Sequence, residues 1–236
     1  MTSKSDITRI FISRPITEVG KALFTFESQG GKLIAESLVK FESVFFDSPD
    51  QTDVIFFSSM RSATYFLNQH SFISPIPKIA CAGQETARKL KETYQLSVDF
   101  IASNAGNPSE EAVEFHKWLG SRTVLFPKSE QSLNSYSKGI PNHQKKEVTV
   151  YRTLSDLKSI PSCDLYIFSS PSNAKSFLAC NQLPENAKCI AWGTSTMKYL
   201  SSQQISPIHS LKTGTLEELD DYINELRSFN SEAHEI

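Results

Sequence analysis

Residues 53–67 read DVIFFSSMRSATYFL, and residues 164–178 read DLYIFSSPSNAKSFL. Seven of the 15 aligned positions are identical, and the two segments lie 111 residues apart. Three similar blocks in the same order predict two copies of one structural unit. The other two blocks are KIACAGQETARKL (78–90) with KCIAWGTSTMKYL (188–200), and AGNPSEEAVEFHKWL (105–119) with KTGTLEELDDYINEL (212–226).

Each copy of the repeat predicts a strand, a polar turn and a helix. Val54–Phe57 and Leu165–Phe168 are short, uninterrupted apolar runs, which are typical of strands buried on both faces of a parallel sheet. Two serines follow each run where a helix begins, and Ser170 followed by Pro171 is a typical helix start. Strands that alternate with helices indicate βαβ units, so the predicted fold class is α/β with parallel sheets.

Further elements flank the first copy. We expect an opening strand at Arg9–Ser13 with a helix at Thr17–Gln29, and a closing strand at Thr123–Phe126 with a helix at Glu130–Ser137. The capping box TLEE, which begins at Thr215, predicts the start of the last helix.

Two polar stretches with alternating character, Leu33–Phe46 and Glu147–Thr153, separate these elements. They predict one Rossmann-like or flavodoxin-like domain interrupted by another, with a two-stranded antiparallel ribbon between them and a cleft between the domains. Ligands of open α/β sheets bind at the carboxyl ends of the strands, where both Ser-Ser turns fall. The predicted boundaries are 1–35 plus 154–236 for the first domain, 42–147 for the second, and 36–41 and 148–153 for the ribbon.

Composition excludes several classes of protein. The 236 residues carry 24 Lys and Arg against 26 Asp and Glu, a net charge of −2, and 39% are hydrophobic. That balance argues against a disordered chain and against a nucleic-acid binder. No apolar run approaches the ~18 residues that span a bilayer, and MTSKSDITR is no secretory signal, so we expect a cytoplasmic protein without membrane contact. Four cysteines without metal-ligand spacing are interpreted as buried free thiols: Cys81, Cys163, Cys180 and Cys189.

The sequence contains no standard cofactor or catalytic motif. Neither GxGxxG nor GxxxxGK[ST] occurs, and no G-x-S-x-G elbow is present. No two of the five histidines stand at ligand spacing. We therefore expect no nucleotide cofactor, no metal and no hydrolase nucleophile.

The turns that follow the predicted strands are candidate anion sites. Free backbone N–H groups and hydroxyls at a helix start bind anions, and the Ser-Ser turns occur twice at matching places. The alternative is that the serines only cap helices and that the glycines of the other two turns, Gly83 and Gly193, only allow close packing. Residues 117–152 carry a net charge of +5 and residues 217–236 a net charge of −6. The basic run is either a solvated face or a rim that attracts a polyanion.

Tyr151, in the segment VTVYRT, is the most suggestive single residue. Its phenol has an ordinary pKa of about 10, so at neutral pH it donates a proton rather than accepts one. The alternative is that the ring only packs.

The ordered motifs resemble those of the uroporphyrinogen-III synthase family over nearly the whole chain. They begin with Ser-Arg-Pro at 13–15 and continue with FFSSMRSATYFL, CAGQETARKL, VLFPKSE, VTVYRT, IFSSPSNAKSF and AWGTSTMKYL. The resemblance implies two α/β domains joined by a ribbon. It also implies a cofactor-free lyase reaction of haem biosynthesis, in which linear hydroxymethylbilane loses water and closes with its last pyrrole ring inverted.

The resemblance also implies roles for single residues. Tyr151 maps onto the family's tyrosine in V-Y-x-T and is the expected acid. The sequence departs from the family at Lys128, where many relatives have Arg, at Met60 and at Met197. The substrate is a linear tetrapyrrole with eight carboxylates, and its expected binding positions are Arg14, Ser58, Ser59, Gly83, Thr86, Lys128, Ser169, Ser170, Ser172, Gly193, Ser195 and Thr196.

Two other functions fit a duplicated α/β pair. A cytoplasmic two-domain binding or sensor protein without catalysis would show the same architecture. A sugar-nucleotide transferase would need a diphosphate site, which the sequence lacks. Tyr151 and the paired Ser-Ser turns favour the enzyme, which we expect to act as a monomer on a small-molecule polycarboxylate.

Overall fold

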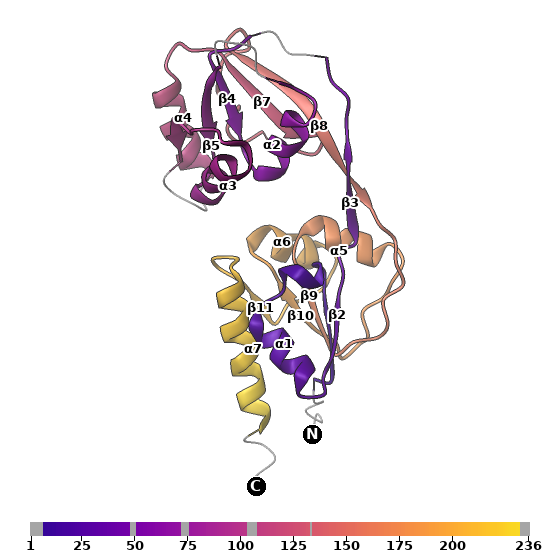
Figure 1. Ribbon diagram of the computed structural model, residues 1–236. Helices are drawn as coiled ribbons and strands as arrows, with labels where there is room; N and C mark the ends of the chain where they lie inside the picture. Colours follow the sequence, from indigo (N-terminus) through magenta and orange to yellow (C-terminus); the bar gives the residue numbers. More distant parts are fainter. Residues whose placement is uncertain (1–6, 48–50, 72–75, 103–107, 133, 232–236) are drawn as a thin grey trace. The chain divides into compact units, whose positions relative to one another are not determined.

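The computed structural model describes residues 7–47, 51–71, 76–102, 108–132 and 134–231. The chain divides into two compact units. Unit 1 comprises Met1–Lys40 and Leu154–Ile236, and unit 2 comprises Phe41–Thr153. Each unit contains its own sheet, so each is described separately (Figure 1).

Unit 1 is built on a parallel sheet, as the sequence predicts: the pairs β1·β2, β1·β9, β9·β10 and β10·β11 all run parallel. The strand order is β11-β10-β9-β1-β2. The strands are β1 (Arg9–Ile12), β2 (Lys32–Ala35), β9 (Leu165–Phe168), β10 (Lys188–Ala191) and β11 (His209–Ser210).

Helices cover both faces of the unit 1 sheet, because successive strand side chains point to opposite sides. Ile12 belongs to a buried cluster with α1 (Lys21–Ser28) and α7 (Leu216–Ser231). Phe11 belongs to the opposite cluster with α5 (Pro171–Leu178) and packs near α6 (Thr194–Ser202). The doubly buried β1 and β9 therefore lie in the interior of the unit, as uninterrupted apolar strands should.

Unit 2 has the strand order β3-β8-β7-β4-β5-β6. Helices α2 (Met60–Leu67) and α3 (Gln84–Tyr94) share one buried cluster with Phe57, whereas α4 (Pro108–Leu119) packs on Phe56 from the other side. The strands are β3 (Val39–Ser43), β4 (Val54–Phe57), β5 (Lys78–Cys81), β6 (Phe100–Ile101), β7 (Val124–Ser129) and β8 (Lys145–Ser155).

Strands β3 and β8 contain the two places where the chain passes between the units. Val44 N–H donates to the Val150 carbonyl at 3.0 Å, and Asp156 N–H donates to the Leu38 carbonyl at 2.8 Å. The residue numbers rise on one strand as they fall on the other, so the pair is antiparallel. An ion pair of 2.7 Å between Arg152 and Glu42 joins the same two strands.

The repeat seen in the sequence is repeated in the structure. Ser59 and Ser170 are the N-caps of α2 and α5, and each side chain accepts a backbone N–H three residues later at 3.2 Å. Asp53 and Asp164 each accept a backbone N–H from the residue just before the neighbouring strand, Thr123 before β7 at 2.7 Å and Thr8 before β1 at 2.8 Å. Equivalent residues therefore make equivalent bonds in the two units.

The expected helix at Glu130–Ser137 is wrong. The described residues of that segment form turns. Serine side chains bind nearby backbone in place of helical bonds: Ser129 Oγ accepts from Gln131 N–H and Ser132 Oγ accepts from Asn134 N–H, both at 3.2 Å. Asn134 adopts φ +56°, which no α-helix tolerates.

The expected helix at Thr17–Gln29 is shorter than predicted. A 3₁₀ turn occupies Ile16–Glu18, and α1 begins at Lys21 after the N-cap Gly20. Gly20 has no side chain to cap the helix, so Asp220 of α7 does so by accepting the N–H groups of Lys21 and Ala22 at 2.9 and 3.1 Å.

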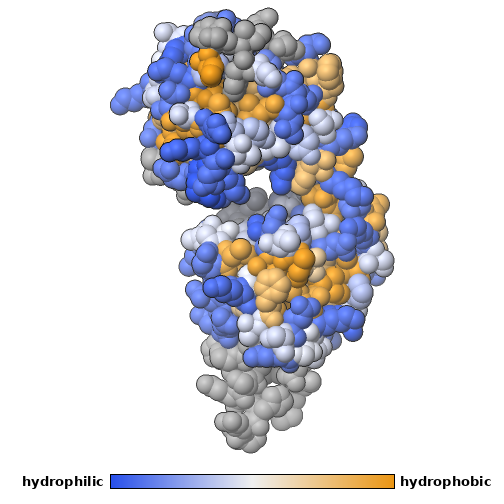
Figure 2. All heavy atoms as spheres, viewed as in Figure 1, coloured by the Kyte–Doolittle hydropathy of each residue, from blue (hydrophilic) through white to orange (hydrophobic). Residues whose placement is uncertain are grey.

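Three of the four thiols are buried as predicted, but the prediction for Cys180 is wrong, because its side chain is exposed just beyond the end of α5. No helix within the described ranges is both long and apolar enough to span a bilayer. On the visible face, hydrophilic side chains cover much of each unit, with apolar patches between them (Figure 2). The largest fully buried side chains are aromatic and aliphatic, and they lie in the clusters on both faces of the two sheets.

Candidate functional site

The candidate residues of unit 1 follow the carboxyl ends of neighbouring strands in its sheet. Strands β10, β9 and β1 are neighbours and run parallel, so their carboxyl ends lie side by side. Arg14 follows β1, Ser169 and Ser170 follow β9, and Gly193 follows β10. The first turns of α5 and α6 hold the remaining candidates, Ser172, Ser195 and Thr196.

Serine hydroxyls at this edge already have structural partners. Ser169 Oγ donates to the Ser13 carbonyl at 2.7 Å, and Ser169 N–H donates to Ser13 Oγ at 2.8 Å. The side-chain amide of buried Asn173 donates to Ser169 Oγ and Ser170 Oγ, and its Oδ1 accepts Leu38 N–H at 2.7 Å. Ser170 Oγ therefore caps α5 and Ser169 Oγ is bound to the Ser13 carbonyl, so both hydroxyls have structural roles. Because Pro171 has no N–H and the Asn173 N–H binds Ser170 Oγ, the candidate anion donors of this turn are the backbone N–H groups of Ser170 and Ser172.

The start of α6 offers backbone donors more than side chains. Gly193 has φ +92°, a conformation that favours glycine, and no side chain caps the helix. Thr196 is fully buried and its hydroxyl donates to the Trp192 carbonyl at 3.4 Å, whereas Ser195 is exposed. Gly83, by contrast, has an extended backbone and room for a Cβ, so close packing does not explain it.

The candidates of unit 2 also lie at the carboxyl ends of adjacent strands. Ser58 and Ser59 follow β4, Gly83 precedes α3, and Lys128 lies in β7. Thr86, in the first turn of α3, is half-buried. The Ser58 side chain is exposed, and no hydrogen bond to its hydroxyl is found within the described residues.

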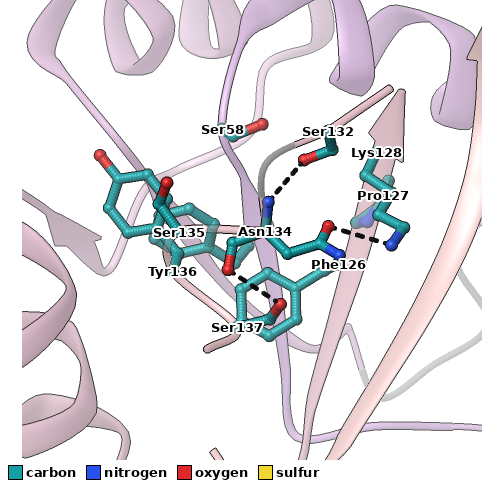
Figure 3. Close-up of a pocket in the computed structure, with 10 residues that line it drawn as sticks. Ser58, Phe126, Pro127, Lys128, Ser132, Asn134, Ser135, Tyr136 and Ser137 are labelled. Carbon is teal, nitrogen blue, oxygen red and sulfur yellow. Dashed lines mark hydrogen bonds between the residues drawn. The ribbon is translucent and has the colours of Figure 1, made fainter. Parts of the chain in front are cut away.

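A small pocket opens at the carboxyl ends of β4 and β7 (Figure 3). Ser58 and Lys128 contribute to its wall, and the turns that replace the expected helix close the other side. Sequence motifs missed these turn residues, although a run rich in Ser and Asn was a signal against a helix. The turn residues that line the pocket are Ser132, Asn134, Ser135, Tyr136 and Ser137.

An ion pair controls the charge of this pocket. Lys128 Nζ binds Asn134 Oδ1 at 3.0 Å and the carboxylate of Glu147, to which the Ser137 hydroxyl also donates. Burial raises the pKa of Glu147, but the hydrogen bonds from Lys128 and Ser137 outweigh it, so its pKa lies below the ordinary value. Glu147 therefore stays ionised and balances the charge of Lys128 at neutral pH.

A hydrogen bond between Tyr136, which lines the pocket, and Glu111 of α4 holds the pocket wall in place. The Tyr136 hydroxyl donates to the buried carboxylate of Glu111 in α4, and the Tyr136 ring packs on Phe56 with centroids 4.6 Å apart. Burial, together with the bond to Glu111, raises the pKa of Tyr136. The phenol therefore remains protonated and anchors the turn.

Tyr151 lies on β8 beside Ser129 of β7. Only 8% of its surface is exposed, and its ring stacks on Tyr65 with centroids 5.3 Å apart and meets Phe41 edge-on at 6.0 Å. No hydrogen bond to its hydroxyl is found in the described part of the chain, and no buried side-chain oxygen there lacks a partner. The ring is therefore packed, and its hydroxyl oxygen is not fully buried. These observations are compatible with packing alone and with proton donation, so the acid role of Tyr151 stays a prediction.

The described residues contain no candidate metal-binding cluster. Among the described residues, no cluster of three or more His, Cys, Asp or Glu side chains is placed to hold an ion.

The guanidinium of Arg14 stacks on the Trp192 ring, with 3.9 Å between the guanidinium carbon and the ring centroid. The sequence motifs did not predict this cation-π contact.

Comparison with known proteins places the chain in one family. The family model described as Uroporphyrinogen-III synthase HemD matches residues 22–221. No curated protein matches by sequence. A uroporphyrinogen-III synthetase structure from Helicobacter pylori 26695 is 19% identical, with a TM-score of 0.68 over 93% of this chain and 100% of that one. A mutant uroporphyrinogen III synthase structure from the extremely thermophilic bacterium Thermus thermophilus is 14% identical, with a TM-score of 0.60 over 94% and 99%. Both structures share the α/β fold described above, and because the family model spans both units, this chain belongs to the uroporphyrinogen-III synthase family.

Proposed function

We propose that this chain is a uroporphyrinogen-III synthase, a lyase that closes linear hydroxymethylbilane with loss of water and inversion of the last pyrrole ring. The observation that carries this proposal is the family match over residues 22–221, which spans both units. The strand-end donors of each unit add physical support, because a substrate with many carboxylates needs many dispersed anion donors.

We propose that the donors differ in kind between strand ends. The starts of α5 and α6 present backbone N–H groups, since the Ser170 and Thr196 side chains are engaged within the protein. At α5 these donors are the N–H groups of Ser170 and Ser172, because Pro171 lacks an N–H and that of Asn173 binds the cap. The exposed hydroxyl of Ser58 and the guanidinium of Arg14 present side-chain donors. Carboxylates bound by charged or aligned donors form stronger hydrogen bonds than neutral pairs do.

We also propose that Tyr151 supplies the proton to the departing hydroxyl of hydroxymethylbilane. Packing on Tyr65 and Phe41 fixes the ring, and the hydroxyl oxygen retains solvent contact. A fixed phenol next to a leaving hydroxyl acts as a general acid. The buried reduced thiols of Cys81, Cys163 and Cys189 agree with a cytoplasmic enzyme, which we propose acts as a monomer.

A coupled assay from porphobilinogen tests the activity. Hydroxymethylbilane generated in situ should be diverted to the type III isomer when the protein is added, and isomer separation of the oxidised products measures this. Because no step requires a metal or nucleotide, EDTA should leave the rate unchanged. Only type I product in the presence of folded protein would refute the enzyme and favour a binding protein.

Two serines at equivalent strand ends, Ser58 and Ser169, form a matched test of substrate-binding hydroxyls against structural ones. Ser58→Ala removes an exposed hydroxyl without a protein partner, so we expect a KM about twofold to tenfold higher and unchanged stability. Ser169→Ala removes the bond to the Ser13 carbonyl, so we expect a loss of about 1 kcal/mol in the free energy of unfolding and a smaller change in KM. Urea denaturation and steady-state kinetics on both variants measure the difference, and the reverse pattern would assign the structural role to Ser58 and the substrate-binding role to Ser169.

A further inference from the structure

The guanidinium of Arg14 lies over the indole ring of Trp192, with its carbon 3.9 Å from the ring centroid. Arg14 follows β1 and Trp192 follows β10, and β9 lies between these strands in the sheet. The stack therefore bridges the carboxyl end of β9, where Ser169 and Ser170 begin the turn into α5. The candidate anion donors of unit 1 lie at this same carboxyl end of the sheet.

Within the described ranges, the N–H groups of the Arg14 guanidinium have no hydrogen-bond acceptor. Among the described residues, no salt bridge or hydrogen bond to its guanidinium is found, and Glu18 is the acidic group that acts on it electrostatically. The side chain is half-buried, and burial lowers its pKa while Glu18 opposes the effect. A half-buried arginine without a hydrogen-bonded carboxylate is incomplete by itself, because the ring face and the charge of Glu18 balance its desolvated charge without accepting its N–H groups.

The Trp192 ring is itself held in place. Its Nε1–H donates to the Gly214 carbonyl at 2.7 Å. Gly214 has φ +64°, and a Cβ at this position would lie 3.3 Å from Nε1, so glycine suits both the backbone and the contact. Glu218 of α7 fixes the loop by accepting the N–H groups of Lys212, Thr213 and Gly214 at 2.6, 2.8 and 3.2 Å. A chain of contacts thus runs from α7 through the loop and the indole to the guanidinium.

The internal repeat shows that this ring is particular to one unit. The equivalent position in the other copy is Ala82, which precedes Gly83 as Trp192 precedes Gly193. Both glycines are followed by a helix at the end of a buried strand, so the local backbone does not require a large ring. A large ring at this position is therefore a feature of unit 1, where the indole packs on the core, binds Gly214 and stacks with Arg14.

We propose that Trp192 is a positioning residue that holds the guanidinium of Arg14 over its ring face, with the guanidinium N–H groups preorganised to bind a carboxylate of the substrate. This inference rests on the proposed function. A planar fork binds carboxylate through two parallel hydrogen bonds, and fixing the side chain beforehand removes the entropy cost of ordering it on binding. The prediction is that Trp192 acts on substrate affinity only through Arg14.

A double-mutant cycle tests this coupling. Trp192→Leu removes the stack and should raise KM for hydroxymethylbilane about threefold to tenfold, with kcat within about twofold of the parent. Arg14→Ala should raise KM roughly tenfold or more. In the Arg14→Ala background, Trp192→Leu should add less than about a twofold change, because the group that it positions is gone. Trp192→Phe keeps a ring but loses the bond to Gly214, so its effect should be intermediate.

A binding measurement separates this inference from the proposed function. The dissociation constant for uroporphyrin III, the oxidised product, followed by porphyrin fluorescence, should rise in parallel with KM in the Trp192 variants. An inactive parent protein that binds no porphyrin overturns the proposed function and with it the carboxylate assigned to Arg14. An active parent whose KM is unchanged in Trp192→Leu, or whose full effect persists without Arg14, overturns the inference alone.

Trp118 provides the matched control. The guanidinium of Arg122 lies over its ring, 4.1 Å from the centroid. Trp118 belongs to α4 of unit 2, however, and Arg122 donates to the backbone carbonyls of Leu119 and Trp118. Trp118→Leu should lower thermal stability as Trp192→Leu does and leave KM within about twofold of the parent. An equal rise of KM in both variants would mean that lost packing, rather than a positioned arginine, weakens binding.

Discussion

Replacing Phe177 with Ala should lower the free energy of unfolding of unit 1 by roughly 3–5 kcal/mol. Phe177 is 1% exposed, and its ring lies 5.2, 5.3 and 5.8 Å from the centroids of Tyr166, Phe168 and Phe11. Removing the ring takes away its own burial and leaves a cavity that this aromatic cluster cannot fill by small movements. Urea denaturation monitored by hydrogen exchange measures the loss.

Phe66 is the equivalent residue of the other copy and gives the matched comparison. It is fully buried, and its ring packs against Phe46 and Phe57 at 5.4 and 5.9 Å. Phe66→Ala should destabilise unit 2 by a similar amount, because the two positions are equivalent in the repeat. Each variant should increase hydrogen exchange mainly in its own unit. Equal increases in both units from either substitution would show that the units unfold together rather than as separate cores.

This equivalence explains why the fold could be predicted from the sequence. Uninterrupted apolar runs such as Val54–Phe57 and Leu165–Phe168 are decided locally, because strands covered on both faces need apolar residues throughout. The helix starts were equally local, since Ser59 and Ser170 cap through bonds three residues away. The capping box at Thr215 was predicted only in part. Thr215 Oγ accepts the Glu218 N–H at 3.2 Å as expected, but the Glu218 carboxylate binds N–H groups of residues 212–214 rather than that of Thr215.

Contacts across the sheet were not predictable in this way. Asp220 caps α1 from 199 residues away, and Trp192 meets Arg14 only because β10 and β1 flank β9. No short motif encodes such pairs, which depend on the strand order. The Lys128 site shows the same limit: sequence identified the cation, but its partner Glu147 lies on the neighbouring strand β8.

Tyr151→Phe should reduce turnover roughly tenfold to a hundredfold while the product stays largely type III. The substitution keeps the ring that stacks on Tyr65 and meets Phe41, and it deletes only the proton donor. General acid assistance typically contributes about 10²–10⁴-fold, and the electron-rich pyrrole already activates this leaving group, so the loss should fall at or below the low end. Ring inversion depends on how the substrate is held, so the isomer ratio should survive.

Tyr65 is the control that separates acid catalysis from packing. It stacks on Tyr151, and its hydroxyl donates to the Phe41 carbonyl at 3.0 Å, so Tyr65→Phe should cost about 1 kcal/mol of stability and leave turnover nearly unchanged. The two phenols differ in one respect, since Tyr65 has a protein partner and Tyr151 contacts solvent instead. Turnover of Tyr151→Phe within twofold of the parent would assign Tyr151 to packing. Mostly type I product would mean that Tyr151 shapes the bound substrate, because losing a proton donor alone slows closure without changing which carbon atoms join.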